Sequence, residues 1–218
     1  MDPQFWFERW AEGRIGFHEG RPNALLVRHL DELAGARRIL VPLCGKALDL
    51  AFLAAQGFEV VGVELVESAV AAFFAERGLV PEVERRGAVV CYRHDTISIL
   101  AGDFFHVTRD DVGACDAVYD RAATIALPES MRRRYADHLR SLLERSARAL
   151  LVTIDYPQER MPGPPFSVPL DAVRALHSDA MVERLAASPA KDGRLAEIGA
   201  EELAIRVRFG EATRPVWV

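Results

Sequence analysis

The pattern of apolar positions changes along the chain between continuous runs and runs that recur with a helical period of about 3.6 residues. Continuous apolar runs predict buried β-strands at 39–43, 60–65, 116–120 and 148–155. Helical spacing, ended in several cases by glycine, predicts helices at 2–13, 23–33, 47–55, 68–77, 128–145 and 171–177. Such alternation is typical of an α/β fold with a mostly parallel central sheet and helices on both faces.

The middle of the chain is less regular. We interpret 81–87 as a charged connector, followed by two β-rich pieces at 88–93 and 96–100 that suit a hairpin extension of the sheet. Five prolines between positions 157 and 169 predict a long irregular loop, of the kind that often lies beside a ligand.

The C-terminal part holds two further strand candidates, at 181–185 and 203–209, which suit an antiparallel pair on one sheet edge. With 218 residues, half of them apolar, the chain is long enough to bury one full core. We therefore expect a single domain over 1–218, in which 1–35 form an N-terminal helical cover. A monomer is expected, because no heptad pattern argues for an obligate partner.

Composition and charge argue against several classes of function. The formal net charge is −5 and the basic run at 132–134 has many acidic neighbours, so no nucleic-acid partner is expected. No apolar stretch could cross a bilayer and the N-terminus lacks a signal pattern, so we expect a cytoplasmic protein without a membrane partner. Three widely spaced cysteines predict free thiols, and no metal site is expected.

The turn after the first predicted strand, Leu43-Cys44-Gly45-Lys46, gives the first chemical signal. It lacks the spaced glycine and the hydroxyl of a P-loop, and it has one of the three glycines that a dinucleotide fold needs. Glu64 ends the next strand, where a carboxylate can hold ribose hydroxyls. This pair predicts a ligand that carries adenosine without a pyrophosphate; the alternative is that Glu64 caps the following helix.

Asp103 and Phe104 follow the strand at 96–100. They offer an acceptor for the exocyclic amine of a purine beside a ring that can stack on it. The same pair is also common where a turn precedes a core aromatic side chain, and that alternative stays open.

Arg121 directly follows the strand at 116–120. Loops at the carboxyl ends of parallel strands face the ligand crevice, so we expect Arg121 to point into it. The alternative is a structural ion pair with Asp120 or Asp116.

With these residues assembled, the chain resembles the thiopurine S-methyltransferase family, class I enzymes that depend on S-adenosylmethionine. The resemblance is carried in family order by Trp6-Phe7-Glu8-Arg9-Trp10 with Gly13, Gly16-Phe17-His18, Val41-Pro42-Leu43-Cys44-Gly45-Lys46, Val61-Gly62-Val63-Glu64, Tyr119-Asp120-Arg121-Ala122, and Asp155-Tyr156-Pro157 with Pro162-Gly163-Pro164-Pro165-Phe166. The Pro-Leu-Cys-Gly-Lys turn is far more specific than a generic glycine-rich loop. The resemblance implies a Rossmann-like class I methyltransferase fold.

The resemblance also implies residue roles around the cofactor. In the family the aromatic N-terminal helix closes over the cofactor, which gives Trp10 and Trp6 a cofactor-side role, whereas the residues alone favour ordinary helix packing. Leu43 matches a backbone contact to the cofactor, and Glu64 matches the ribose ligand. Arg121 matches an arginine near both cofactor and substrate.

On the substrate side, the resemblance implies an aromatic contact from Phe17 and a second arginine, Arg194, in addition to Arg121. The region around Asp103 departs from some relatives, and the C-terminal part matches the family least.

The implied reaction is an in-line displacement in which an aromatic or heterocyclic thiol, such as a thiopurine, takes the methyl group and S-adenosylhomocysteine is left. Such a thiol supplies its thiolate readily, so alignment and exclusion of water suffice. Arg121 cannot accept a proton near neutral pH and would position the thiolate. His18 could accept a proton, although a capping or core role is favoured.

Three other functions stay open. Selenium or tellurium species could be the physiological acceptors, because they are soft nucleophiles that fit the same apolar pocket. An NAD(P)-dependent oxidoreductase shares the architecture but is disfavoured by the missing glycines. A non-catalytic S-adenosylmethionine-binding protein would bind the cofactor and release no product.

Overall fold

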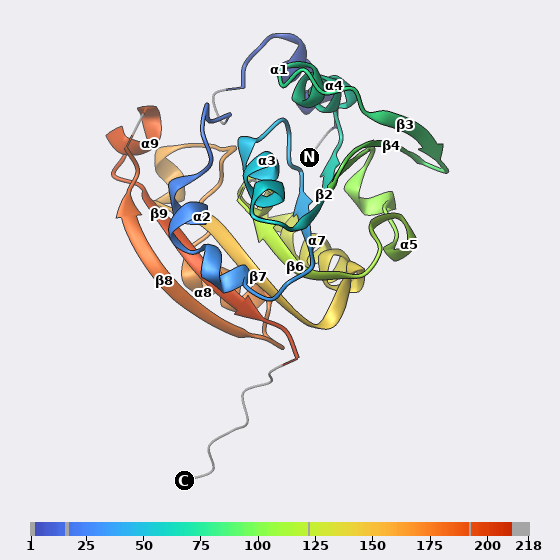
Figure 1. The fold of residues 1–218 in the computed structure, drawn as a ribbon. Coiled ribbons are helices and arrows are strands. Elements are labelled where there is room, and N and C mark those ends of the chain that lie inside the picture. Colours follow the sequence, from blue (N-terminus) through green and yellow to red (C-terminus); the bar gives the residue numbers. More distant parts are fainter. Residues whose placement is uncertain (1–2, 16–17, 122, 192, 211–218) are drawn as a thin grey trace.

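A computed structural model of the chain describes residues 3–15, 18–121, 123–191 and 193–210. Its centre is a nine-stranded sheet in the order β3-β4-β5-β2-β1-β6-β7-β9-β8 (Figure 1). The strands are β1 (Arg38–Pro42), β2 (Glu59–Glu64), β3 (Glu82–Arg86), β4 (Val89–His94), β5 (Ile97–Ala101), β6 (Cys115–Asp120), β7 (Leu143–Asp155), β8 (Met181–Pro189) and β9 (Glu201–Arg208).

The five central strands, β5-β2-β1-β6-β7, run parallel to one another. Antiparallel strands extend the sheet at both edges, β4 and β3 beside β5, and β9 and β8 beside β7. The predicted α/β fold, the hairpin and the antiparallel pair at the C-terminal edge are confirmed. The carboxyl ends of the parallel strands meet at one edge of the sheet, called here the carboxyl edge.

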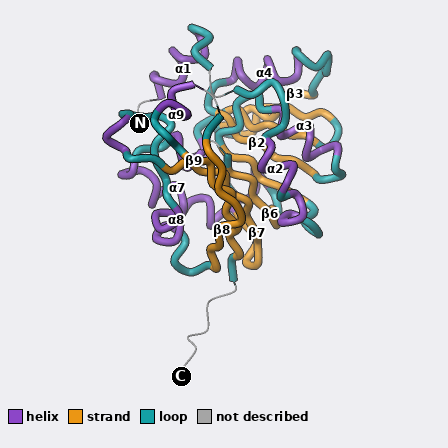
Figure 2. The backbone as a smooth tube through the Cα atoms, turned by 90° about the vertical axis from the view of Figure 1, so that its left-hand side faces the viewer, coloured by secondary structure: helices purple, strands orange, loops and turns teal. Residues whose placement is uncertain are grey.

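Helices cover both faces of the sheet (Figures 1 and 2). They are α1 (Pro3–Ala11), α2 (Ala24–Arg28), α3 (Leu48–Ala55), α4 (Glu67–Ala75), α5 (Arg109–Val112), α6 (Ala123–Ala126), α7 (Glu129–Leu142), α8 (Leu170–Leu176) and α9 (Gly193–Glu197), with short 3-10 turns at Leu30–Leu33, Phe104–His106 and Gln158–Arg160. Side chains of α2, α3 and α4 form one apolar core with the sheet. Those of α5, α7 and α8 form a second core.

Several expected elements differ from the structure; β7 begins at Leu143 and β8 extends to Pro189, and three other differences have a clear physical reason. The charged connector at 81–87 contains strand β3, which pairs with β4 through its backbone; as an exposed edge strand it needs no apolar pattern. The predicted helix at 23–33 breaks at His29, which has φ −114° and ψ 25° and ends α2. The helix expected over 128–145 ends at Leu142, because the next residue already pairs with β6 as the start of β7.

The N-terminal helix α1 lies at the carboxyl edge together with α4, at the top of both views (Figures 1 and 2). None of its residues is buried. Within the described residues, no helix is long and apolar enough to cross a membrane. The same residues hold no group of three or more His, Cys, Asp or Glu side chains that could bind a metal ion.

Candidate active site

The turn after β1 bends sharply at the carboxyl edge. Leu43 has φ 49° and Gly45 has φ 54°, both in the left-handed region. A non-glycine residue with positive φ is uncommon, and such residues concentrate at ligand sites. The amide of Cys44 donates to the carbonyl of Val63 at 3.0 Å, which holds this turn against the end of β2.

Glu64 joins the two strand ends. One carboxylate oxygen accepts a hydrogen bond from the amide of Gly45 at 2.8 Å, and the other accepts one from the amide of Val66 at 2.8 Å. The side chain is buried, and burial raises the pKa of this carboxyl above its ordinary value while the backbone hydrogen bonds oppose the rise. Val66 is the N-cap residue of α4, so the bond from its amide to Glu64 also holds the start of that helix, close to what the capping alternative expects.

Trp10 covers the turn from α1. A Cβ atom added to Gly45 would lie 3.2 Å from Cζ2 of Trp10, so the indole rests directly on the glycine. Trp6, one turn earlier on α1, packs edge-on against Phe5 with the ring centroids 5.2 Å apart. The structure thus brings Trp10 to the strand ends through a glycine that has no side chain to obstruct it.

Cys44 and Lys46 are engaged in structural contacts. Gly62 on β2 leaves room for the Cys44 thiol, because an added Cβ would lie 2.7 Å from its sulfur. Burial, followed by the charge of Glu64, raises the pKa of this thiol well above its ordinary value, which keeps it protonated. Lys46 forms an ion pair with Glu76 at 2.5 Å. Neither side chain is set up as a nucleophile or a phosphate ligand.

Arg121 lies at the end of β6 and forms an ion pair with Glu19. The two partners expected from the sequence are engaged elsewhere. Asp120 accepts hydrogen bonds from the hydroxyls of Thr124 and Tyr135, and Asp116 accepts from the backbone amides at 37 and 38. Sequence reasoning missed Glu19, since nothing local links two residues 102 positions apart.

His18 lies beside the same cluster. Burial, followed by the charge of Lys46, lowers its pKa below the ordinary value, with Arg121 contributing in the same direction. Its imidazole is therefore neutral near pH 7. The segment after α1 consequently carries an uncharged imidazole and, at Glu19, a carboxylate toward Arg121.

Asp103 and Phe104 follow β5 at the same edge. One Asp103 carboxylate oxygen accepts from the amide of Phe105 at 3.0 Å and caps the 3-10 turn, while the side chain stays 40% exposed. The Phe104 ring is 4% exposed and packs against Tyr135 and His138, with centroids 5.2 and 5.1 Å apart. This matches the alternative of a turn before a core aromatic, and the purine contact of Phe104 stays a prediction.

Phe17 and Arg194 are the two other candidates for substrate contacts. Phe17 lies outside the described residues. Arg194 on α9 is 63% exposed and pairs with Glu197 of the same helix at 3.1 Å. The strand residues that flank α9, Pro189 and Glu201, pair with each other. Glu201 also pairs with Asp155 at the end of β7, so α9 lies at the carboxyl edge.

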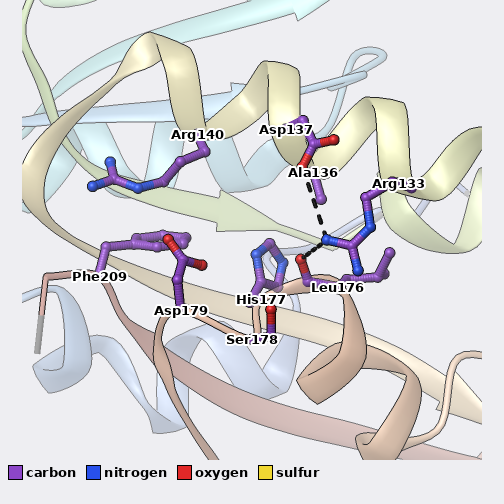
Figure 3. Close-up of a pocket in the computed structure, with 9 residues that line it drawn as sticks. All are labelled: Arg133, Ala136, Asp137, Arg140, Leu176, His177, Ser178, Asp179 and Phe209. Carbon is purple, nitrogen blue, oxygen red and sulfur yellow. Dashed lines mark hydrogen bonds and ion pairs between the residues drawn. The ribbon is translucent and has the colours of Figure 1, made fainter. Parts of the chain in front are cut away.

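A separate hollow lies between α7, α8 and Phe209 (Figure 3). Arg133 donates to the carbonyl of Leu176, and the Arg140 guanidinium lies 4.9 Å from the centre of the Phe209 ring. Phe209 follows Arg208, which pairs with Arg148 toward the opposite end of β7 from the carboxyl edge. This hollow is therefore remote from the strand ends that carry Glu64 and Arg121.

Comparison with known proteins decides the family. The family profile described as Thiopurine S-methyltransferase (TPMT) matches residues 1–207. The chain belongs to this family. Among curated relatives, a thiopurine S-methyltransferase of Pseudomonas aeruginosa (strain UCBPP-PA14) is 53% identical over 180 residues, covering 82% of this chain and 83% of the relative. That of Azotobacter vinelandii (strain DJ) is 50% identical over 191 residues, covering 87% and 88%.

Solved structures confirm the class I methyltransferase fold. A 1,6-didemethyltoxoflavin-N1-methyltransferase from Burkholderia thailandensis, with bound S-adenosylhomocysteine, aligns with a TM-score of 0.64 at 16% identity and covers 95% of this chain and 86% of that one. The N-methyltransferase NodS from Bradyrhizobium japonicum aligns with a TM-score of 0.60 at 14% identity, covering 87% and 89%. The chain is thus a methyltransferase whose methyl donor is S-adenosylmethionine.

The residues at the carboxyl edge suit that donor. Both Glu64 oxygens accept backbone N–H bonds, and a carboxylate has about four lone-pair positions, which allows it to accept from a ribose hydroxyl as well. The exposed part of Asp103 lies at the end of the next strand, within the same row of strand ends. Gly45 has no side chain, so the backbone of the turn after β1 lies directly beneath the indole of Trp10.

Proposed function

We propose that this methyltransferase acts on the sulfur of aromatic and heterocyclic thiols, thiopurines among them. The observation that carries the proposal is the partly buried guanidinium of Arg121 at the end of β6, two strands from Glu64. A fixed cation at this place favours an acceptor that reacts as an anion. Relatives at about half sequence identity are named thiopurine S-methyltransferases, which supports the same substrate class.

Around the cofactor, residues at each strand end would contact a different part of S-adenosylmethionine. Leu43 contacts the cofactor through its backbone, and Glu64 holds the ribose. Asp103 accepts from the adenine amine, with Phe104 beside it. Trp10, and Trp6 behind it, exclude water from above the turn. Exclusion of water strengthens each electrostatic contact inside the site.

On the acceptor side, Arg121 orients the thiolate, with Phe17 and Arg194 as further contacts. When bound, S-adenosylmethionine supplies a methyl group already activated by a sulfonium. The acceptor thiol loses its proton to solvent, and its sulfur electron pair forms the new S–CH3 bond as the bond to the sulfonium breaks. Alignment of the two sulfur atoms with the methyl group supplies most of the rate gain, which reaches several kcal/mol in well-oriented reactions.

The proposal is tested by measuring S-adenosylhomocysteine and methylated product over a panel of acceptors. We expect turnover with 6-mercaptopurine and thiophenol, and none with hypoxanthine, which carries oxygen in place of sulfur. Turnover confined to selenite or tellurite would replace the thiol by a metalloid acceptor. Binding of S-adenosylmethionine without turnover of any acceptor would contradict an enzymatic role.

Arg121→Ala tests the residue that carries the proposal. Loss of a charged contact to the thiolate is expected to lower kcat/KM for 6-mercaptopurine by about 10- to 100-fold. Arg134→Ala is a matched control, because Arg134 is an exposed arginine of α7 that packs over the ring of Phe105. Wild-type kinetics in Arg121→Ala would leave this arginine a structural residue.

A further inference from the structure

The carboxylate of Glu19 is held in place from two directions. The oxygen that pairs with Arg121 also accepts a hydrogen bond from the side-chain amide of Asn23 at 3.2 Å. The carbonyl oxygen of that amide is already used, because it accepts from the backbone of Leu25 at 2.9 Å and caps α2. The orientation of Asn23 is thereby fixed, with its NH2 group toward Glu19.

Asn23 is itself anchored to the floor of the site. Its backbone amide donates to Asp49 at 2.7 Å, and the other oxygen of Asp49 accepts from the hydroxyl of Tyr119 at 3.3 Å. Asn23 and Asp49 are 4% and 2% exposed. Tyr119 precedes Arg121 by two residues on β6, so the segment carrying Glu19 is tied to the end of that strand at two points.

Glu19 therefore places a fixed negative charge against the cation that meets the acceptor. The side chains of Arg121 and Glu19 are 18% and 35% exposed, which limits screening of the pair by solvent. Their charges cancel at a distance, while a single anionic sulfur close to Arg121 still meets its guanidinium. An acceptor with a second negative group would meet the charge of Glu19.

Resting on the proposed function, we propose that Glu19 determines acceptor specificity by charge. It favours thiols whose body is neutral and disfavours thiols that carry a further carboxylate or phosphate. Glu19 acts through Arg121 and through its own field, and it takes no part in proton transfer.

The test compares 4-methylthiophenol with 4-mercaptobenzoate, two thiols of similar shape that differ by one negative charge. Wild-type enzyme is expected to prefer the neutral thiol. Glu19→Gln keeps an acceptor oxygen for Arg121 and Asn23 but removes the charge. It should lower the ratio of kcat/KM between the neutral and the anionic thiol about five- to tenfold, the effect of one charge acting over roughly 12 Å at an effective dielectric constant of about 20.

Two further readouts separate this role from a merely structural one. With 4-methylthiophenol, the acid limb of the pH–rate profile should move to lower pH in Glu19→Gln, because loss of a nearby negative charge stabilises the bound thiolate. Glu19→Ala removes both the charge and the hydrogen bonds and should shift the specificity ratio in the same direction. Glu12→Gln, which removes an exposed carboxylate paired with Arg14 on the same segment, should leave the ratio unchanged.

Failure of charge selection by Glu19 can be told apart from failure of the proposed thiol methylation. If wild-type enzyme methylates both thiols and Arg121→Ala is impaired, but the specificity ratio is equal in wild type and Glu19→Gln, charge selection by Glu19 is overturned and the thiol activity stands. If wild-type enzyme methylates neither of these thiols nor 6-mercaptopurine, both proposals are overturned.

Discussion

At the scale of single residues, Glu64 accepts two backbone amides and is proposed to hold the cofactor ribose, and one substitution tests both roles. Both of its oxygens accept backbone amides, so Glu64→Gln must turn an NH2 group toward the amide of Gly45 or of Val66. We expect this conflict to lower the free energy of unfolding by about 1–3 kcal/mol and to weaken cofactor binding at least about tenfold. Urea unfolding and calorimetric titration with S-adenosylhomocysteine measure the two effects.

Glu67→Gln is the matched control for Glu64. This carboxylate lies three residues further on, on α4, and accepts from the exposed hydroxyl of Tyr92. Its loss should change the unfolding free energy by no more than about 0.5 kcal/mol and leave the cofactor affinity unchanged. Wild-type affinity in Glu64→Gln would remove this residue from the ribose site.

Two glycines separate backbone strain from the contact with Trp10. Gly45 and Gly78 both have positive φ, at 54° and 65°, so alanine at either position should cost about 1–2 kcal/mol of stability. Only at Gly45 would the new methyl group meet an indole, because nothing lies within 4 Å of a Cβ at Gly78. We expect Gly45→Ala alone to change tryptophan fluorescence and to weaken cofactor binding. Equal cofactor affinity in both variants would contradict a covering role for Trp10.

At the scale of elements, the junction of α8 with α7 and β9 holds a buried histidine. His177 ends α8, packs edge-on against Phe209 with ring centroids 5.6 Å apart, and is 4% exposed. Desolvation lowers its pKa from 6.5 to about 4, and nearby Asp179 opposes this shift while Arg133 adds to it. The native state therefore keeps this ring neutral where the unfolded chain would protonate it.

This shift makes stability depend on pH between those two values. The histidine binds a proton in the unfolded state below about pH 6.5 but in the native state only near pH 4, so the unfolding free energy falls as pH drops through this window. The unfolding free energy of the wild type should fall by up to about 3 kcal/mol, at about 1.4 kcal/mol per pH unit. That of His177→Gln should not show this fall. Urea unfolding at pH 7 and pH 5 measures the difference. Parallel curves for wild type and His177→Gln would mean that the buried ring does not contribute to acid sensitivity.

The elements also show where sequence patterns suffice and where they do not. The parallel strands were predictable because burial on both faces requires continuous apolar runs, as at 148–155. Strand β3 was not, because an exposed edge strand is held by backbone pairing that its polar side chains do not reveal. Among the candidate site residues, Glu64 and Arg121 were predicted from their places at strand ends, whereas Glu19 lies in a connection whose path only the tertiary structure determines.

At the scale of the whole molecule, cofactor binding should stabilise the folded chain, because the site joins turns from several strand ends. A ligand at 100 times its Kd adds about 2.7 kcal/mol to the unfolding free energy. For a chain of this size we expect the Tm to rise by roughly 5–10 °C with S-adenosylhomocysteine. NAD at the same concentration is the control and should leave Tm unchanged. An equal shift with NAD would mean that the site does not distinguish S-adenosylhomocysteine from other ligands that carry adenosine.

The lack of buried residues in α1 has a kinetic consequence. A helix whose side chains are at most half-buried contributes little to the stability of the fold, so we expect it to move away from the site while the sheet and the apolar cores stay intact. Because Trp10 on this helix rests on the turn after β1, that movement uncovers the carboxyl edge. We expect spent S-adenosylhomocysteine to depart by this route, so that solvent viscosity slows each catalytic cycle even when the chemical step is fast.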